Sequence, residues 1–205
     1  MCSSDLSDNQ ITGFNPGAMK YQCKIDFDKF DSRETIVIVS PGNFNDMVEY
    51  PRACKAKGID YILDPGQSLP MWDKNDLIQA IEGCRILIVN DYELSLIMSK
   101  TGLNKNALLK MAGTVITTLG ELGSQVSTLT SDIAIPPVKL KKVVDPTGAG
   151  DAYRGGLLSG LVQGKDIVTS AKMGSVSASY AVETYGTQEY SYTSEEYHQR
   201  LNDLL

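Results

Sequence analysis

The sequence predicts an α/β fold with a mostly parallel sheet and helices on both of its faces. Short apolar runs rich in β-branched residues, such as residues 85–89 (RILIV), alternate with segments whose apolar residues recur at helical spacing. The runs are apolar at nearly every position, which is typical of strands that are buried on both faces. Strands of this kind, joined by helices, form parallel sheets.

Turn residues follow each strand-like run, so the order of the elements can be predicted along the chain. The predicted strands are residues 34–40, 59–63, 85–89 and 114–118. The predicted helices are residues 45–57, a helix capped by Asp73, a short helix after Glu93 and a helix from Asn104 to Met111. Residues 125–130 and 133–138 predict a β-hairpin or an edge ribbon.

The stretch 143–156 (VVDPTGAGDAYRGG) is the part of the chain most suggestive of a binding site. It predicts a strand that starts at about Lys142, a tight turn around Gly148 and Gly150, and a helix that begins at Asp151. The first N–H groups of such a helix have no intrahelical partner and point at the turn. The turn can therefore hold an anion without any basic side chain.

Asp151 stands among these anion-binding amides. A carboxylate makes chemical sense there if the anion is a phosphoryl group in transit and the carboxylate accepts the proton of the attacking hydroxyl. An ordinary Asp-Pro turn followed by a helix cap is the alternative. Arg154, one turn into the helix, either contacts a phosphate or is an ordinary solvated side chain. The P-loop pattern is absent, and Tyr153 stands where the dinucleotide fingerprint requires glycine or alanine.

Two further polar or glycine-rich segments, residues 90–93 and 118–123, directly follow predicted strands. The carboxyl ends of parallel strands lie at one edge of a sheet, where such folds bind ligands. We therefore expect these segments to meet residues 148–151 at one rim. Taken singly, each has an ordinary explanation, because Asn90 also suits a helix cap and the glycines also suit plain turns.

The composition favours one globular domain with one sizeable core, since 42% of the 205 residues are hydrophobic. A net charge of −6 argues against a nucleic-acid or anionic-membrane partner. The cysteines are far apart and His198 is the one histidine, so we expect no zinc site and a reduced, cytoplasmic setting. Cys54 and Cys84 are predicted core residues. We identify no signal peptide and no membrane span.

The heptapeptide at residues 145–151 (DPTGAGD) resembles the C-terminal signature of the ribokinase-like, or PfkB, family of sugar and nucleoside kinases. The resemblance runs from about Asn9 to Leu205 and implies the three-layer ribokinase-like α/β fold. It also implies direct transfer of the γ-phosphoryl group of ATP to a primary alcohol. The residues that it implies for catalysis are Asp151 as the base, with Gly148, Ala149 and Gly150 as the anion hole.

The resemblance also assigns the ATP side of the site. Asn90-x-x-Glu93 is similar to the family motif that helps to hold Mg²⁺ on the nucleotide phosphates, usually through water, and Mg²⁺ needs few direct protein ligands. Asp145 lies where many members bind a monovalent cation such as K⁺. The residues implied along ATP itself are Thr118, Gly120, Gly123, Thr147, Ser175 and Gly186.

Three details resemble the bacterial adenosine kinase-like branch of the family: Pro146, residues 153–156 and residues 185–190. They favour an adenosine-like nucleoside as the acceptor. Two alternatives stay open. One is a sugar kinase of the ribokinase or fructokinase type, and the other is a noncatalytic nucleotide-binding fragment or regulatory remnant.

Residues 8–18 are interpreted as an inner strand and turn, although almost nothing precedes them. We therefore interpret residues 1–205 as the C-terminal larger part of one ribokinase-like kinase domain, with residues 1–6 non-native and the family's N-terminal portion and lid missing. A short native arm is the alternative for residues 1–6. The missing portion carries most substrate ligands, so activity of this chain alone stays open. Uncovered sheet edges favour aggregation or a homodimer.

Overall fold

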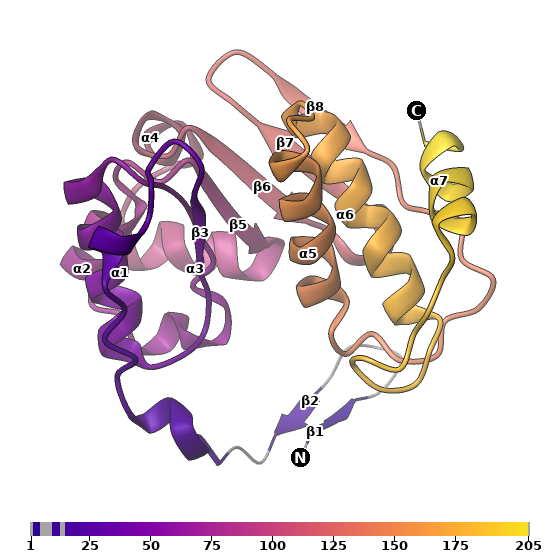
Figure 1. The fold of residues 1–205 in the computed structure, drawn as a ribbon, viewed down its shortest axis with the longest axis horizontal. Coiled ribbons are helices and arrows are strands. Elements are labelled where there is room, and N and C mark those ends of the chain that lie inside the picture. Colours follow the sequence, from indigo (N-terminus) through magenta and orange to yellow (C-terminus); the bar gives the residue numbers. More distant parts are fainter. Residues whose placement is uncertain (1, 5–9, 13–14, 205) are drawn as a thin grey trace. The chain divides into compact units, whose positions relative to one another are not determined.

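The computed structural model describes residues 2–4, 10–12 and 15–204 (Figure 1). Its main sheet has six strands in the order β3-β4-β5-β6-β7-β8. The chain divides into two compact units. We call residues 16–118 and 127–132 the sheet unit, and residues 1–15, 119–126 and 133–205 the helix unit.

The sheet unit is built on parallel strands, and the middle strands bury most of their side chains. These strands are β3 (Ile36–Val39), β4 (Asp60–Leu63), β5 (Ile86–Asn90) and β6 (Thr114–Thr118). Each pairs in parallel with the next. The side chains of Ile62, Leu87 and Ile88 are at most 2% exposed, although neighbours along a strand point to opposite faces. Both faces of the sheet are therefore covered, and the parallel sheet predicted from the apolar runs is confirmed.

Helices follow the strands in the predicted order. They are α1 (Phe44–Lys57), α2 (Lys74–Ile81), α3 (Asp91–Thr101) and α4 (Lys105–Met111). Short 3₁₀ turns occupy Gly17–Lys20, Phe27–Lys29 and Gly66–Met71. Each α-helix follows a residue whose side chain accepts N–H groups of the first turn: Asn43, Asp73, Asn90 and Asn104. Among the described residues, no helix has the length and apolar character of a membrane span.

The core of the sheet unit contains Trp72, which packs edge-on against Phe44 with ring centroids 5.3 Å apart. Cys54 and Cys84 are 0% and 2% exposed, which confirms their prediction as core residues. Burial raises the pKa of Cys54 to about 11 and that of Cys84 to about 12. Both thiols therefore stay protonated at neutral pH and pack as small apolar groups.

The helix unit contains α5 (Ala149–Val162), α6 (Ile167–Val182) and α7 (Ser194–Asn202), with α5 and α6 side by side (Figure 1). It also contains the 3₁₀ turn Gly120–Leu122 and the antiparallel pair β1 (Cys2–Ser4) and β2 (Gln10–Thr12). The last two strands of the main sheet are β7 (Ser124–Ser127) and β8 (Asp132–Ile135), which are neighbours close to the predicted hairpin positions.

Parts of the N-terminal predictions lie outside the described residues. The inner strand and turn expected at residues 8–18 include residues 8–9 and 13–14, which are not described, whereas β2 and the first 3₁₀ turn fall within the rest. Residues 1, 5 and 6 of the segment interpreted as non-native are also outside the described residues.

The prediction of a strand at about Lys142 is wrong. Residues 142–146 are all described and contain no strand. The N–H groups of Val144 and Asp145 both donate to the carbonyl oxygen of Val182 at the end of α6, at 2.9 and 3.2 Å. Pro146 then has no N–H to offer to a ladder. The helix also begins earlier than predicted, at Ala149 instead of Asp151.

Glycines allow α5 and α6 to approach closely. A Cβ atom on Gly156 would lie 2.5 Å from the carbonyl oxygen of Met173, and one on Gly160 would lie 2.7 Å from the hydroxyl of Ser170. Both distances are too short for real carbon atoms. The neighbouring Gly155 instead has no atom within 4 Å of such a Cβ.

An ion pair fastens α7 to α6. Nη2 of Arg200 donates to Oε2 of Glu183 at 2.6 Å, and the N–H of Lys141 donates to Oε1 at 2.6 Å. The side chains of Glu183 and Arg200 are only 10% and 13% exposed. Burial opposes ionisation of Glu183, but the hydrogen bonds from Arg200 and Lys141 outweigh burial, so its pKa lies below the ordinary value.

The contrast between the two adjacent glycines of α5 can be tested directly. Gly156→Ala should lower the free energy of unfolding by roughly 1–3 kcal/mol, because the added methyl group collides with α6. Gly155→Ala, the matched control, should raise it by about 0.5–1 kcal/mol because alanine favours the helix. Urea unfolding of both variants measures this. Equal stability of the two variants would contradict the packing described.

Glu183 gives the fold a predictable pH dependence. Because its pKa is lowered on folding, its contribution is fully present above the unfolded pKa and is lost as the pH falls through the folded pKa. Glu183→Gln should cost about 1–3 kcal/mol at pH 7, because Arg200 loses its charged partner. The melting-temperature difference from the wild type should shrink below pH 4.5. Exposed Glu121→Gln is the control, and a difference independent of pH would exclude this role for Glu183.

Candidate functional site

The turn at residues 145–151, which we call the Gly148 turn, leads into α5. Gly148 caps the helix with φ 83°. A Cβ atom on Gly148 would also lie 3.2 Å from the Cβ of Thr187, so both conformation and space require glycine. The N–H of Ala149 donates to the carbonyl oxygen of Pro146 at 3.1 Å. The next N–H groups lie in the first turn of a 14-residue helix, at the positive end of its dipole, where an anion is favoured.

Asp145 braces this turn. Its Oδ1 accepts the N–H of Thr147 at 2.9 Å, and its Oδ2 accepts the N–H of Gly186 at 3.2 Å. Hydrogen bonds from Thr147 and then from the Gly186 N–H hold the pKa of Asp145 below its ordinary value. Asp145, Thr147, Gly148 and Gly186, all predicted from the sequence as site residues, therefore lie together in the helix unit.

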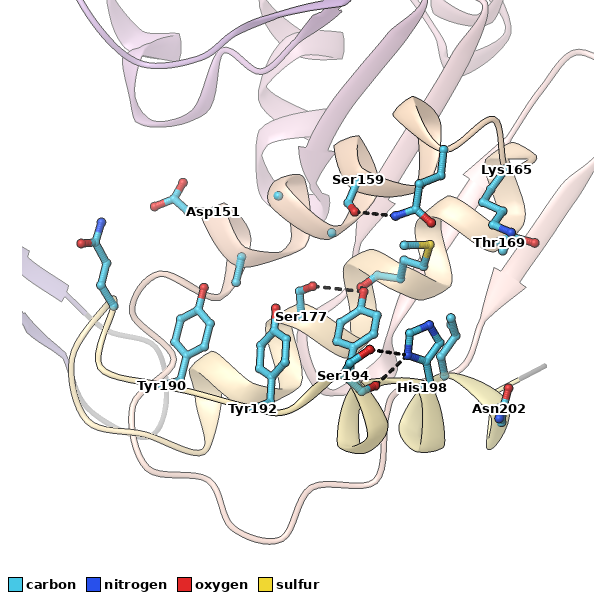
Figure 2. Close-up of a pocket in the computed structure, with 18 of the residues that line it drawn as sticks. Asp151, Ser159, Lys165, Thr169, Ser177, Tyr190, Tyr192, Ser194, His198 and Asn202 are labelled. Carbon is cyan, nitrogen blue, oxygen red and sulfur yellow. Dashed lines mark hydrogen bonds between the residues drawn. The ribbon is translucent and has the colours of Figure 1, made fainter.

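Asp151 lies in the third position of α5 and is open to a ligand. Its side chain is 87% exposed. It lines one end of a cavity of about 980 Å³, with Lys165 and Thr169 at the other end (Figure 2). Tyr190 and Tyr192 form part of the wall, with their rings stacked 6.3 Å apart. No side-chain cap hydrogen bond is present at the start of α5, so Asp151 is not the helix cap.

Arg154 is the cation beside Asp151. Its Nη1 lies 3.3 Å from Oδ1 of Asp151, and its side chain is only 18% exposed. A Cβ atom on Gly150 would lie 2.8 Å from the same Nη1, so the guanidinium group lies over the glycine. Arg154 is therefore not an ordinary solvated side chain, which was one of the two sequence interpretations.

The residues predicted for Mg²⁺ and ATP in the sheet unit also lie close together. Asn90 ends β5 and is the register partner of Thr118, which ends β6. The side chain of Asn90 accepts the N–H of Glu93 at 2.7 Å, and Oε2 of Glu93 accepts the N–H of Asn90 at 2.9 Å. This reciprocal capping box explains both residues locally. Oε1 of Glu93 takes no part in it.

Of the other residues predicted to lie along ATP, Gly120 is open to a ligand, whereas Gly123 and Ser175 have roles in packing. Gly120 has φ 57° and open space around it, so a ligand could approach its backbone. Gly123 is required for packing, because a Cβ atom there would lie 2.2 Å from the carbonyl oxygen of Ile135. Ser175 lies near the hydroxyl of Tyr153, which shares a hydrogen bond of 2.9 Å with Ser124 and whose pKa burial raises to about 12. Packing of α6 against α5 thus gives Ser175 an explanation that needs no nucleotide.

The predicted site residues fall into two groups. Asn90, Glu93 and Thr118 belong to the sheet unit, and the others belong to the helix unit. Their expected meeting at one rim stays a prediction. Among the described residues, no three His, Cys, Asp or Glu side chains form a cluster that could hold a metal ion directly. The contact of Thr187 with Gly148 was not predicted, because the residues are distant in sequence and no local pattern links them.

Comparison with known proteins identifies the family. The model of the pfkB family of carbohydrate kinases matches residues 4–194. A nucleoside kinase of Methanocaldococcus jannaschii is 34% identical over 186 residues, which cover 90% of this chain and 60% of that protein. The chain thus spans about 60% of the length of this relative and of the nucleoside kinase of Methanothermobacter thermautotrophicus.

Solved structures agree with this assignment. A nucleoside kinase of Burkholderia thailandensis in complex with ADP-inosine has a TM-score of 0.92 at 35% identity, covering 100% of this chain and 64% of its own. The Methanocaldococcus jannaschii nucleoside kinase, described as an archaeal member of the ribokinase family, has a TM-score of 0.85 at 30% identity, covering 98% and 67%. The resemblance inferred from residues 145–151 is confirmed. The chain belongs to the pfkB family of carbohydrate kinases and has the ribokinase-like fold.

Proposed function

We propose that the protein to which this chain belongs transfers the γ-phosphoryl group of ATP to the primary alcohol of a nucleoside. The observation that carries this proposal is the Gly148 turn, where an exposed carboxylate, Asp151, lies within the first turn of α5. That turn favours an anion, and the carboxylate can accept a proton beside it. The relatives named nucleoside kinases support a nucleoside acceptor.

The proposed reaction is a single in-line displacement. The acceptor hydroxyl oxygen attacks the γ-phosphorus of ATP, and the bond from that phosphorus to the bridging oxygen breaks. ADP leaves with the electron pair, and Asp151 takes the proton of the hydroxyl. The N–H groups of Gly148, Gly150 and Asp151 neutralise charge on the transferred group, whereas that of Ala149 donates to Pro146. Their positions are fixed before the reaction because Asp145 holds the turn.

The nucleotide requires further groups. Thr118 and Gly120 are proposed to lie along ATP, with Gly123, Thr147, Ser175 and Gly186 around it. Asn90 and Glu93 would hold Mg²⁺ through water, which fits because Oε1 of Glu93 lies outside the capping box. Mg²⁺ would supply positive charge on the polyphosphate. Asp145 is held in place by two N–H groups, and its pKa lies below the ordinary value, so this charged carboxylate fits a monovalent cation such as K⁺.

A sugar acceptor is the second candidate, because the matched family model describes carbohydrate kinases. Adenosine and inosine compared with ribose and fructose as acceptors, with ADP release as the readout, separate the two. The cytoplasm is the compartment we propose, since ATP is the phosphoryl donor and the described thiols are free.

Asp151 provides the mutational test of the mechanism. Asp151→Asn should lower turnover by roughly 10²- to 10⁴-fold, because the proton acceptor is lost. Stability should change by less than about 1 kcal/mol, because only an exposed charge near a helix start is removed. Steady-state kinetics and thermal melting of the protein that carries this chain measure both effects.

Glu195→Gln is the matched control, since it also removes an exposed acidic charge from the first turn of a helix. It should leave turnover unchanged. A fully active Asp151→Asn enzyme would rule out the proposed mechanism.

A further inference from the structure

The position of Arg154 is unusual for a helix-surface arginine. Its guanidinium group lies over the backbone of Gly150, in the space that any side chain at residue 150 would fill. It is largely buried, whereas its carboxylate partner Asp151 is almost fully exposed. Exposed ion pairs contribute little to stability. The pair with the exposed carboxylate of Asp151 therefore adds little to the stability of the fold.

The charges at the Gly148 turn point to a role for Arg154 in binding a ligand. The turn is proposed to hold a phosphoryl group directly beside the carboxylate of Asp151. Two negative groups in contact repel each other, although water around the exposed carboxylate weakens this repulsion. The ion pairs of the described residues give Asp151 one cationic partner, Arg154, at 3.3 Å. A cation at this position offsets the repulsion and allows the anion and the base to lie side by side.

The chemistry of the guanidinium group fits this role. Arginine is always charged and carries five N–H donors in one plane, which match the oxygen atoms of a phosphoryl group in pairs. The first N–H groups of α5 belong to the same turn that this guanidinium group covers at Gly150. Together they offer backbone and side-chain donors to one anion, without any ligand from another part of the chain.

We infer that Arg154 binds the γ-phosphoryl group of the nucleotide and so distinguishes the triphosphate from the diphosphate at the Gly148 turn. The inference rests on the proposed function and deepens it. Asp151 and the γ-phosphoryl group share the guanidinium group, and Gly150 is glycine because a side chain there would displace it.

Isothermal titration of this chain with Mg²⁺ and either adenylyl imidodiphosphate or ADP tests the inference without any catalytic turnover. The wild type should bind the triphosphate analogue more tightly than ADP. Arg154→Gln should weaken binding of the analogue by roughly tenfold or more, the usual value for a lost hydrogen bond to a charged group, and should leave ADP affinity within about twofold. Arg154→Lys should keep part of the difference, because it keeps the charge but loses the planar donors.

Gly150→Ala is the second variant. It keeps Arg154, but the added methyl group displaces the guanidinium group from its position over residue 150. The contact of the added methyl group is with the far end of a flexible side chain, so the variant should fold with an unchanged melting temperature. It should nevertheless lose preference for the triphosphate analogue, as Arg154→Gln does. Gly155→Ala, whose added methyl group meets no atom, should keep the preference.

The results of these titrations distinguish failure of the role inferred for Arg154 from failure of the proposed function. If the wild type binds both nucleotides but Arg154→Gln weakens both equally or neither, the inference is wrong and the proposed function stands. If the folded wild type binds neither nucleotide, the proposed function fails and the inference fails with it. Selective loss of triphosphate binding in both Arg154→Gln and Gly150→Ala supports the inference.

Discussion

The carboxylate of Asp145 is the constraint on which the candidate site depends. A glycine turn is flexible by itself, and its N–H groups can bind an anion tightly only if they are held in place beforehand. One oxygen of Asp145 holds the turn from within through Thr147, and the other oxygen holds the Gly186 loop against it. The N–H of Asp145 is held in turn by Val182, the last residue of α6.

Further contacts in the helix unit connect the Gly148 turn to α6 and α7. Glu183, next to Val182, accepts the N–H of Lys141 and pairs with Arg200 of α7. The guanidinium group of Arg200 also lies 3.8 Å from the ring centre of Tyr180. The segment that enters the Gly148 turn is thus fixed by α6, and α6 is fixed by α7. A short loop can in this way keep one conformation although its own sequence favours several.

Three charged groups meet at the same site: the positive start of α5, the carboxylate of Asp151 and the guanidinium group of Arg154. The start of α5 favours an anion, whereas Asp151 opposes one, and Arg154 lies where it can balance the two. Asp151 itself is exposed and lines the cavity shown in Figure 2.

The sequence predicted the parallel strands and the bodies of the helices well, because strands buried on both faces have an apolar pattern that few other structures share. It placed Asp145, Gly148 and Gly186 in one site through a family resemblance. It failed at residues 142–146, because the backbone there donates to Val182, a tertiary partner that no local pattern reveals. The place of Arg154 over Gly150 could not be predicted either, since it depends on a side-chain conformation.

The central claim is that the N–H groups of the Gly148 turn hold the phosphoryl group. Amide chemical shifts in ¹H–¹⁵N spectra of this chain test it most directly, during titration with Mg²⁺ and adenylyl imidodiphosphate and, separately, with adenosine. The account predicts downfield shifts of the amide protons of Gly148, Gly150 and Asp151 with the phosphorylated ligand alone, because the phosphate oxygens that accept these N–H groups are absent from adenosine. Binding of the nucleotide with these three amides unmoved would contradict it.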